Sequence, residues 1–305
     1  MPAHMFERVI VADWSANATP KLGADSIWLA VCDAAGSIDT VNLPTRLDAE
    51  KLLMDLCGSD DGPATLLGVD FSLGYPEGTA ELWGLDKRPA WTALWQTLAA
   101  LVDDGPRNAN NRFEVASTLN RRGSVPAAGP GGPFWGCPPK RATSWLRTTK
   151  PARADEWPAQ WRRTEMVMRQ QGYRPFDCWQ LLGAGTVGSQ SLTGIPMLER
   201  LRTRCGSRVE VWPFSHGLCR PVVRPGSLVV AEVWPSLLPF DVDERAVRDE
   251  TQVITTARWL ADADGRGDLA PMFEPSIGAA SRQAVTVEEG WVLGVDAPSN
   301  GAMVG

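Results

Sequence analysis

Four acidic residues occupy positions where a lone carboxylate is costly. Asp13 and Asp70 each end an apolar, strand-like run, Glu232 interrupts another, and Asp249 opens a late helix-like stretch. A carboxylate beside buried apolar residues needs compensation for its charge. Several together repel one another and raise one another's pKa values unless a cation holds them. Because Mg²⁺ and Mn²⁺ favour oxygen ligands, we predict a Mg or Mn site formed by these four side chains.

Composition narrows the classes of protein that are possible. The chain has 305 residues and a formal net charge of −6, which disfavours a protein whose whole surface binds nucleic acid but allows a local basic face. No apolar stretch approaches the roughly 20 residues that span a bilayer, and the N-terminus lacks a signal-peptide core. We therefore expect a cytoplasmic protein with no membrane partner.

Histidine and cysteine offer little material for other chemistry. The six cysteines include no CxxC pair, and the only histidines are His4 and His216. This spacing is typical neither of a zinc site nor of a disulfide framework. We expect most of the cysteines to be buried and reduced.

The elements that must position the acids follow from hydrophobic periodicity. A Thr45–Asp48 capping box predicts a helix that runs to about Cys57, and Pro89 fits the first turn of a second helix that extends to Val102. A third helix is expected to carry Trp157, Trp161 and Met168 and to stop at Gly172. Expected strands cover 6–13, 26–32, 38–43, 64–70, 208–214, 227–234 and a final short run at 290–295, and a late helix covers 243–262.

The middle of the chain differs in charge from both ends. Residues 107–174 contain 13 Arg or Lys and 4 acids, a net +9, which leaves −15 for the rest of the chain. Gly123–Pro139 holds five glycines and five prolines, which indicates a loop. We predict that 107–207 is a basic, Trp-rich insertion or lid and that 1–106 and 208–305 form the core.

Two interpretations of this basic segment remain open. It is either a solvated face or lid, or a flap that binds substrate phosphate through Arg141, Arg162 and Arg163. Four tryptophans that interleave with Arg and Lys could stack on bases: Trp135, Trp145, Trp157 and Trp161. We expect Ser15 and Ser72 to contact substrate as well.

A glycine-rich stretch, Gly183–Gly188, matches the GxGxxG pattern of dinucleotide-binding folds. The run before it is a poor buried strand, and Ser189, Ser191 and Thr193 should delay any helix until about Pro196. A loop whose backbone N–H groups touch a phosphate is therefore favoured over a dinucleotide site.

The element order and the acidic motifs together resemble those of the predicted ribonuclease H-like nucleases, an uncharacterised family. The shared features are an Asp ending the first strand, a hydrophobic-Asp-x-Ser-x-Gly turn, a Glu-x-x-Pro motif and an Asp opening a late helix. In this chain they are Asp13, Asp70, Glu232 and Asp249, and the resemblance covers roughly 1–100 and 220–265. It implies an α/β fold with a ribonuclease H-like mixed sheet that is flanked by helices. The first three strands of this sheet would be antiparallel and the later strands parallel.

The resemblance also implies a two-metal phosphodiester hydrolase. Asp13 would bridge both ions, Asp70 and Glu232 would each complete one, and Asp249 would contribute from its helix. The substrate would be nucleic acid or a phosphorylated small molecule. Two alternatives remain: an ATP-dependent small-molecule kinase of the actin-like class, for which Ser15–Gly23 with Lys21 is a loose phosphate hairpin, and a non-catalytic scaffold.

Overall fold

One mixed sheet carries all of the strands in the part of the chain that the computed structural model describes, residues 4–85, 89–125, 129–238 and 247–296. The order across the sheet is β3-β2-β1-β4-β6-β5. The strands are β1 (Arg8–Asp13), β2 (Ile27–Asp33), β3 (Ile38–Leu43), β4 (Thr65–Val69), β5 (Val209–Val211) and β6 (Leu228–Glu232).

The pairing changes from antiparallel to parallel at β1. Strands β1, β2 and β3 form an antiparallel meander, whereas β1–β4, β4–β6 and β5–β6 are parallel pairs. Both β4 and β6 are buried along their whole length, as expected of apolar parallel strands that are covered on two faces. The predicted α/β class with a mixed sheet is confirmed.

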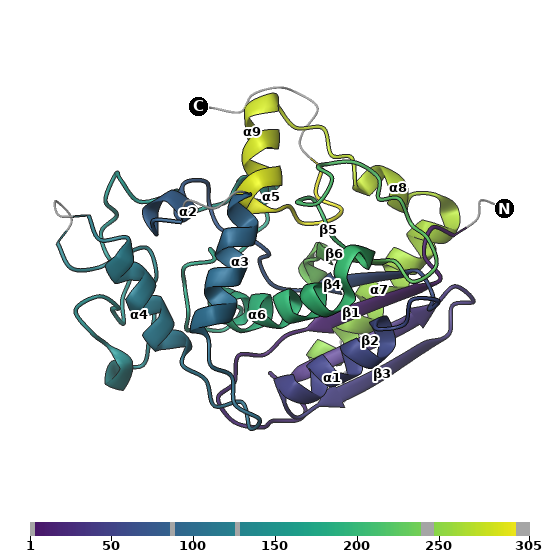
Figure 1. Cartoon of the computed structure of the whole chain (residues 1–305), viewed down its shortest axis with the longest axis horizontal. Helices are drawn as coiled ribbons and strands as arrows, with labels where there is room; N and C mark the ends of the chain where they lie inside the picture. Colours follow the sequence, from purple (N-terminus) through teal and green to yellow (C-terminus); the bar gives the residue numbers. More distant parts are fainter. Residues whose placement is uncertain (1–3, 86–88, 126–128, 239–246, 297–305) are drawn as a thin grey trace.

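Helices cover both faces of this sheet (Figure 1). The described helices are α1 (Arg46–Cys57), α2 (Thr79–Leu82), α3 (Ala90–Leu101), α4 (Arg112–Arg122), α5 (Arg163–Gln170), α6 (Gly188–Cys205), α7 (Arg248–Arg266), α8 (Leu269–Met272) and α9 (Ala279–Ala284). Short 3₁₀ turns cover Pro139–Arg141, Gly206–Arg208 and Pro235–Leu237, and a π-helical turn, Val285–Glu289, follows α9. The predicted cap of α1 is present, since Thr45 Oγ1 accepts a hydrogen bond from Asp48 N at 3.1 Å.

Strand alternation assigns each side chain of β1 to one of two cores. Ile10 and Ala12 pack in the core that contains α1, α3 and α6. Val9 and Val11 pack in the core that contains α7. Because successive side chains point to opposite faces, Asp13 continues the row that faces α7.

Helix α6 departs from the predicted organisation, because it lies against the sheet although it falls inside the expected 107–207 insertion. Its side chains Leu192, Ile195, Leu198 and Leu201 are fully buried in the core shared with β1 and β4. The helix begins at Gly188 and continues through Pro196, so the expected delay until Pro196 is wrong. Proline removes one backbone donor, but the buried apolar face on either side stabilises the helix.

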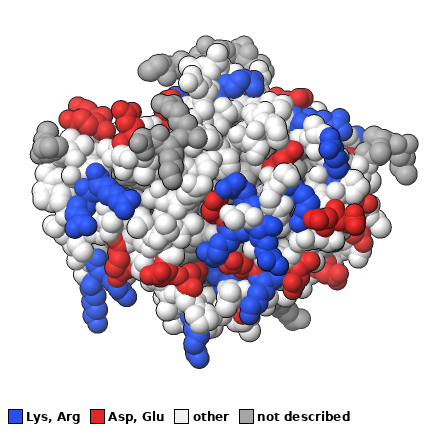
Figure 2. Space-filling view, in the orientation of Figure 1, with Lys and Arg blue, Asp and Glu red and all other residues white. Residues whose placement is uncertain are grey.

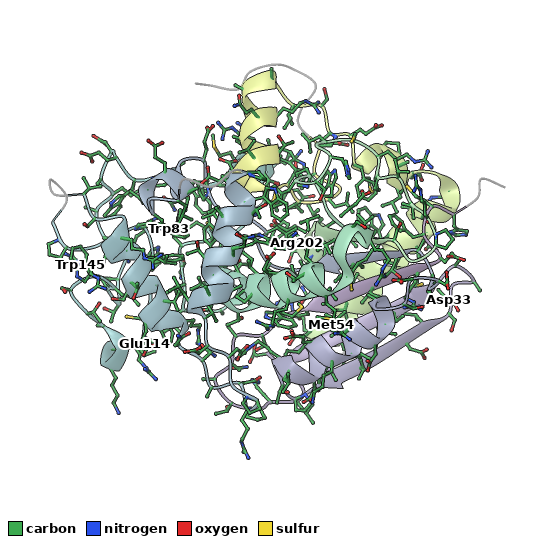
Figure 3. The ribbon with its side chains drawn as sticks, viewed as in Figure 1. Asp33, Met54, Trp83, Glu114, Trp145 and Arg202 are labelled. Atoms are coloured by element: carbon green, nitrogen blue, oxygen red, sulfur yellow. The ribbon has the colours of Figure 1, made fainter. Side chains whose placement is uncertain are left out.

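Other parts of the middle segment contribute aromatic rings to the same core. Tyr75, Trp83, Phe134 and Trp179 form ring contacts with one another at centroid distances of 5.1–6.5 Å. Figure 3 shows Trp145 beside α4, at the edge of the molecule away from the sheet. Basic and acidic side chains alternate over the face seen in Figure 2, so no continuous basic patch covers this face.

Several predicted boundaries shift. The third predicted helix, α5, begins only at Arg163, so Trp157 and Trp161 precede it. Strand β5 is shorter than 208–214 because Pro213 lacks the N–H that a ladder needs. The run 290–295 contributes a single bridge, Glu232 to Val292. The late helix starts at Arg248, and 243–246 lies outside the described residues.

The state of the cysteines agrees with the expectation from composition. All six cysteines are free, and five of them are buried. Among the described residues, no helix combines the length and the apolar character needed to cross a membrane.

Candidate functional site

The register of β1 and β4 places Asp13 and Asp70 side by side at the carboxyl ends of two parallel strands. Ala12 pairs with Val69, so Asp13 and Asp70 are the next neighbours along the strands. Asp70 N donates to Ala12 O at 3.2 Å, and Asp70 Oδ1 accepts from Trp14 N at 2.8 Å. Both carboxylates line one hollow of about 670 Å³.

These two carboxylates disturb each other's ionisation. Burial, repulsion from Asp70 and a hydrogen bond to Asp70 hold the pKa of Asp13 well above its usual range. Burial also raises the pKa of Asp70 to about 6, although the same hydrogen bond and the Trp14 N–H oppose the rise. Two buried, neighbouring carboxyl groups with raised pKa values form an acidic site that a cation would stabilise.

Asp249 reaches the same hollow from the first turn of α7. Its Oδ2 accepts from Asp25 N at 2.6 Å, a contact that fixes the carboxylate against the loop after β1. Burial raises the pKa of Asp249, and its charge raises the pKa values of both Asp13 and Asp70. Three of the four predicted acids therefore meet in one electrostatically coupled group.

Glu232 also lines this hollow, but it does not contribute to the pKa shifts of the three aspartates. It pairs in register with Val69 rather than Asp70, so its side chain belongs to the opposite face of the sheet from Asp13 and Asp70. Its two carboxylate oxygens accept from Arg162 Nη1 at 2.7 Å and Nη2 at 2.6 Å, and Oε2 also accepts from Leu73 N at 3.1 Å. These hydrogen bonds compensate the charge of the buried Glu232 carboxylate without a metal ion.

Arg162 is the buried cation that pairs with Glu232. Only 1% of its surface is exposed, and its guanidinium also donates to Glu165 and to the carbonyl of Glu289. A cation that is buried and shared between two carboxylates in this way has no donor pointing into the hollow. The arrangement differs from the expected role of Arg162 in binding substrate.

The other predicted substrate contacts separate into two groups. Ser15 and Ser72 line the hollow, and Ser15 Oγ donates to Asp25 O at 3.1 Å. Arg141 pairs with Glu114 beside α4, and Arg163 pairs with Glu77 and Glu289. Neither of these arginines lines the hollow.

Sequence reasoning passed over other residues of this hollow. Arg112, Arg174 and Phe176 line it together with the loop Gly183–Gly185 and the start of α6. The arginines were counted in the basic segment, but nothing local distinguishes them from their neighbours. The only signal was the glycine-rich loop, for which a phosphate contact was expected.

The carboxylates of the hollow are of the ligand type that could hold a hard divalent cation. Asp13, Asp70 and Asp249 offer carboxylate oxygens from three separate elements, the ligand type that Mg²⁺ and Mn²⁺ prefer. Within the described ranges, no three His, Cys, Asp or Glu side chains are already arranged tightly enough to hold a metal. Burial is the main cause of the raised pKa values of these three carboxyl groups, and repulsion between neighbouring carboxylates adds to it.

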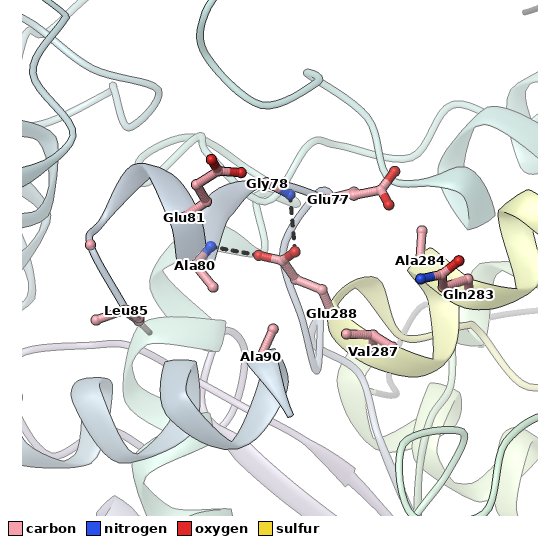
Figure 4. Close-up of a pocket in the computed structure, with 11 residues that line it drawn as sticks. Glu77, Gly78, Ala80, Glu81, Leu85, Ala90, Gln283, Ala284, Val287 and Glu288 are labelled. Atoms are coloured by element: carbon pink, nitrogen blue, oxygen red, sulfur yellow. Dashed lines mark hydrogen bonds between the residues drawn. The ribbon is translucent and has the colours of Figure 1, made fainter. Parts of the chain in front are cut away.

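A second hollow, of about 610 Å³, lies between α2 and the turn after α9 and is also acidic. Figure 4 shows Glu288 there, with its carboxylate accepting from Gly78 N at 2.9 Å and Ala80 N at 2.6 Å. Glu288 thus compensates the unpaired N–H groups at the start of α2, which is a structural role.

Comparison with known proteins does not extend the assignment beyond this geometry. No protein-family description, no curated protein and no solved structure matches the chain.

Proposed function

We propose that this chain is a metal-dependent phosphodiester hydrolase on a ribonuclease H-like core, with Asp13, Asp70 and Asp249 as the ligands of Mg²⁺ or Mn²⁺. The observation that carries the proposal is the coupled pair Asp13 and Asp70 at adjacent parallel strand ends, with Asp249 in the same hollow. Such a pair is costly in a metal-free protein, and a function that requires a cation explains it.

The order of the elements supports the fold part of the proposal. A meander of three antiparallel strands, a helix, a parallel strand and later a second parallel strand followed by a helix is the order expected of a ribonuclease H-like protein. Here β1 to β4, β6 and α7 follow that order, and β5 adds a short edge strand.

The roles of the residues follow from their contacts. The charges of both Asp70 and Asp249 raise the pKa of Asp13, and Asp13 would be the ligand shared by two ions. The Trp14 N–H orients Asp70, and the Asp25 N–H orients Asp249. A bound divalent ion would activate water and stabilise the leaving oxygen. Glu232 holds the turn after β4 through Leu73 N and so positions Asp70 indirectly.

Asp13→Asn tests the proposal directly. The change keeps the side-chain shape but removes the charge shared with Asp70, so we expect Mn²⁺ affinity, measured by calorimetry, to fall at least about tenfold. Cleavage of an oligonucleotide should fall by about a hundredfold or more, because removing one electrostatic contact of a transition state costs about that much. The metal-free melting temperature should hold or rise, since repulsion is relieved.

Asp55→Asn is the matched control, because Asp55 is exposed on α1, outside the hollow, and it should behave as the wild type. Unchanged Mn²⁺ binding in Asp13→Asn would contradict the proposal. ATP-dependent release of ADP without cleavage would favour the actin-like kinase, and a chain that binds neither metal nor nucleotide would be a scaffold.

A further inference from the structure

The hollow that holds Asp13 and Asp70 has a second wall of different character. The segment between α5 and α6 supplies Arg174, Phe176 and Leu182 to this wall. Phe176 is 41% exposed and Leu182 is 47% exposed. Large apolar side chains that stay exposed in a concave surface lined with charged groups are typical of ligand sites rather than of packing.

Phe176 is supported from one side by the glycine-rich loop. A Cβ atom at Gly185 would lie 3.0 Å from Phe176 Cε2, and Gly185 has a φ of +75°. The absence of a side chain at Gly185 therefore lets the backbone approach the ring. An aromatic ring that lies beside this loop and keeps much of its surface exposed offers a surface on which a base can stack.

Arg174 differs from the other arginines of the basic segment. Arg141 and Arg163 pair with carboxylates, whereas Arg174 is exposed, lines the hollow and makes no hydrogen bond or ion pair within the described part of the chain. A guanidinium without a partner, beside a site that binds cations, is suited to hold the phosphate that such cations contact.

Arg112 provides a second, more rigid cation. Its Nε donates to Ser189 Oγ at 2.9 Å and its Nη1 to Asn110 Oδ1 at 2.8 Å, and no described carboxylate lies within ion-pair distance. Burial and the neighbouring Arg46 lower the pKa of Arg112 to about 10, so an anion would stabilise its charge. The start of α6 lies in the same wall and adds the positive end of its dipole.

We infer that Arg112, Arg174 and Phe176 form the subsite for one nucleotide unit of the substrate. The two guanidiniums bind its phosphate, and the ring of Phe176 stacks on its base. The inference rests on the proposed function, because it places that phosphate beside Asp13 and Asp70. A hollow of about 670 Å³ has the size of a small-molecule site, which suits a free nucleotide or a short stretch of single strand rather than a duplex.

The test is binding of a fluorescein-labelled oligothymidylate to the full chain, followed by anisotropy in Ca²⁺, an oxygen-ligated cation that can neutralise the carboxylates. Arg174→Ala should weaken binding about tenfold and reduce the slope of log affinity against log salt by about 0.7. Phe176→Ala should weaken binding about tenfold or more and leave the salt slope unchanged. An abasic oligomer should not distinguish Phe176→Ala from the wild type.

Two exposed residues outside the hollow supply matched controls. Arg147→Ala removes a guanidinium whose one hydrogen bond to a described residue is to Pro130 O at 3.0 Å, and Met166→Ala removes an apolar side chain on α5. Both should bind within about twofold of the wild type, as substitutions at unengaged surface sites do. Losses in these controls equal to those in Arg174→Ala and Phe176→Ala would overturn the subsite, as would binding of a duplex alone.

Competition by thymidine monophosphate separates a free nucleotide from a strand, and success of either ligand supports the subsite. Cleavage of the same probe in Mn²⁺ separates this inference from the proposed function. If binding depends on Arg174 and Phe176 but no cleavage occurs, the subsite is supported and the proposed hydrolase activity is contradicted. If cleavage occurs and neither substitution changes its KM, the hydrolase activity is supported and the subsite is contradicted.

Discussion

Asp70 and Glu232 end neighbouring parallel strands one register step apart, and that step separates their surroundings. Asp70 faces Asp13 and the α7 side of the sheet, whereas Glu232 faces Arg162. A strand alternates its side chains with a period of two residues, so a shift of one position moves a carboxylate from one face to the other. Sequence motifs that record only "acid at a strand end" cannot see this difference.

The raised pKa of Asp70 predicts how stability changes with pH. Burial raises the folded pKa of Asp70 to about 6, above the roughly 3.9 of an unfolded Asp, so the native state binds protons that the unfolded chain releases. The contribution is therefore fully present below about pH 4 and is lost as the pH rises through about 6.

In urea denaturation with a chelator, the wild type should lose about 1–2 kcal/mol relative to Asp70→Asn between pH 4 and 7. Saturating Mg²⁺ should restore the lost stability at pH 7 in the wild type but not in Asp70→Asn. If the stability of the wild type and that of the variant change with pH in parallel, the folded pKa of Asp70 is not raised.

Glu232→Gln separates a structural carboxylate from a metal ligand. The change removes one charge from the buried group Arg162–Glu165–Glu232, and losing one partner of a buried ion pair costs about 3 kcal/mol. We expect that loss in urea denaturation, with Mn²⁺ affinity changed less than in Asp13→Asn. Glu114→Gln, which affects an exposed pair, should cost under about 1 kcal/mol. A variant with wild-type stability but no metal binding would make Glu232 a ligand.

At the scale of elements, the turn after β4 is fixed from two directions. Leu73 N donates to Glu232, and Tyr75 N donates to Glu288 O at 3.2 Å in the π-helical turn. Between these contacts, Gly74 has no room for a side chain, since a Cβ there would lie 2.1 Å from Glu288 O. The C-terminal segment thus braces the loop that carries Asp70.

Gly74→Ala should therefore destabilise the protein by about 1–3 kcal/mol, the usual cost of overpacking. It should also weaken Mn²⁺ binding, because the displaced turn carries Asp70. Gly278→Ala is the matched control, since a Cβ at Gly278 meets nothing within 4 Å. Thermal melts and Mn²⁺ calorimetry measure both effects. Equal melting temperatures for the two variants would show that the turn accommodates a side chain at Gly74 without loss of stability.

At the scale of the whole molecule, the basic middle segment is not a separable lid, because α6 belongs to the layer that covers the sheet. Replacing 107–207 with a Gly-Ser linker would expose Ile10, Leu67 and Val69, which α6 helps to bury. We expect the shortened chain to lose cooperative unfolding in urea, since its core could no longer exclude water. A cooperative transition close to that of the full chain would show that 1–106 and 208–305 fold without α6.

Local sequence signals determined much of the framework. Alternation and apolar runs predicted β1 to β4, β6 and most of α1, α3 and α7, because period and capping are properties of adjacent residues. The same runs placed Asp13 and Asp70 at strand ends and Asp249 at the start of a helix, and the structure brings these three together.

Only the tertiary structure decided which charged residues pair and which face the hollow. The link between Arg162 and Glu232 joins residues 70 positions apart, and the contact of Arg112 with Ser189 joins residues 77 positions apart. Such contacts depend on strand register and on helix packing, which no local pattern encodes. The sequence alone therefore identified the four acids, all of which line the hollow, and long-range packing paired the fourth, Glu232, with the buried arginine.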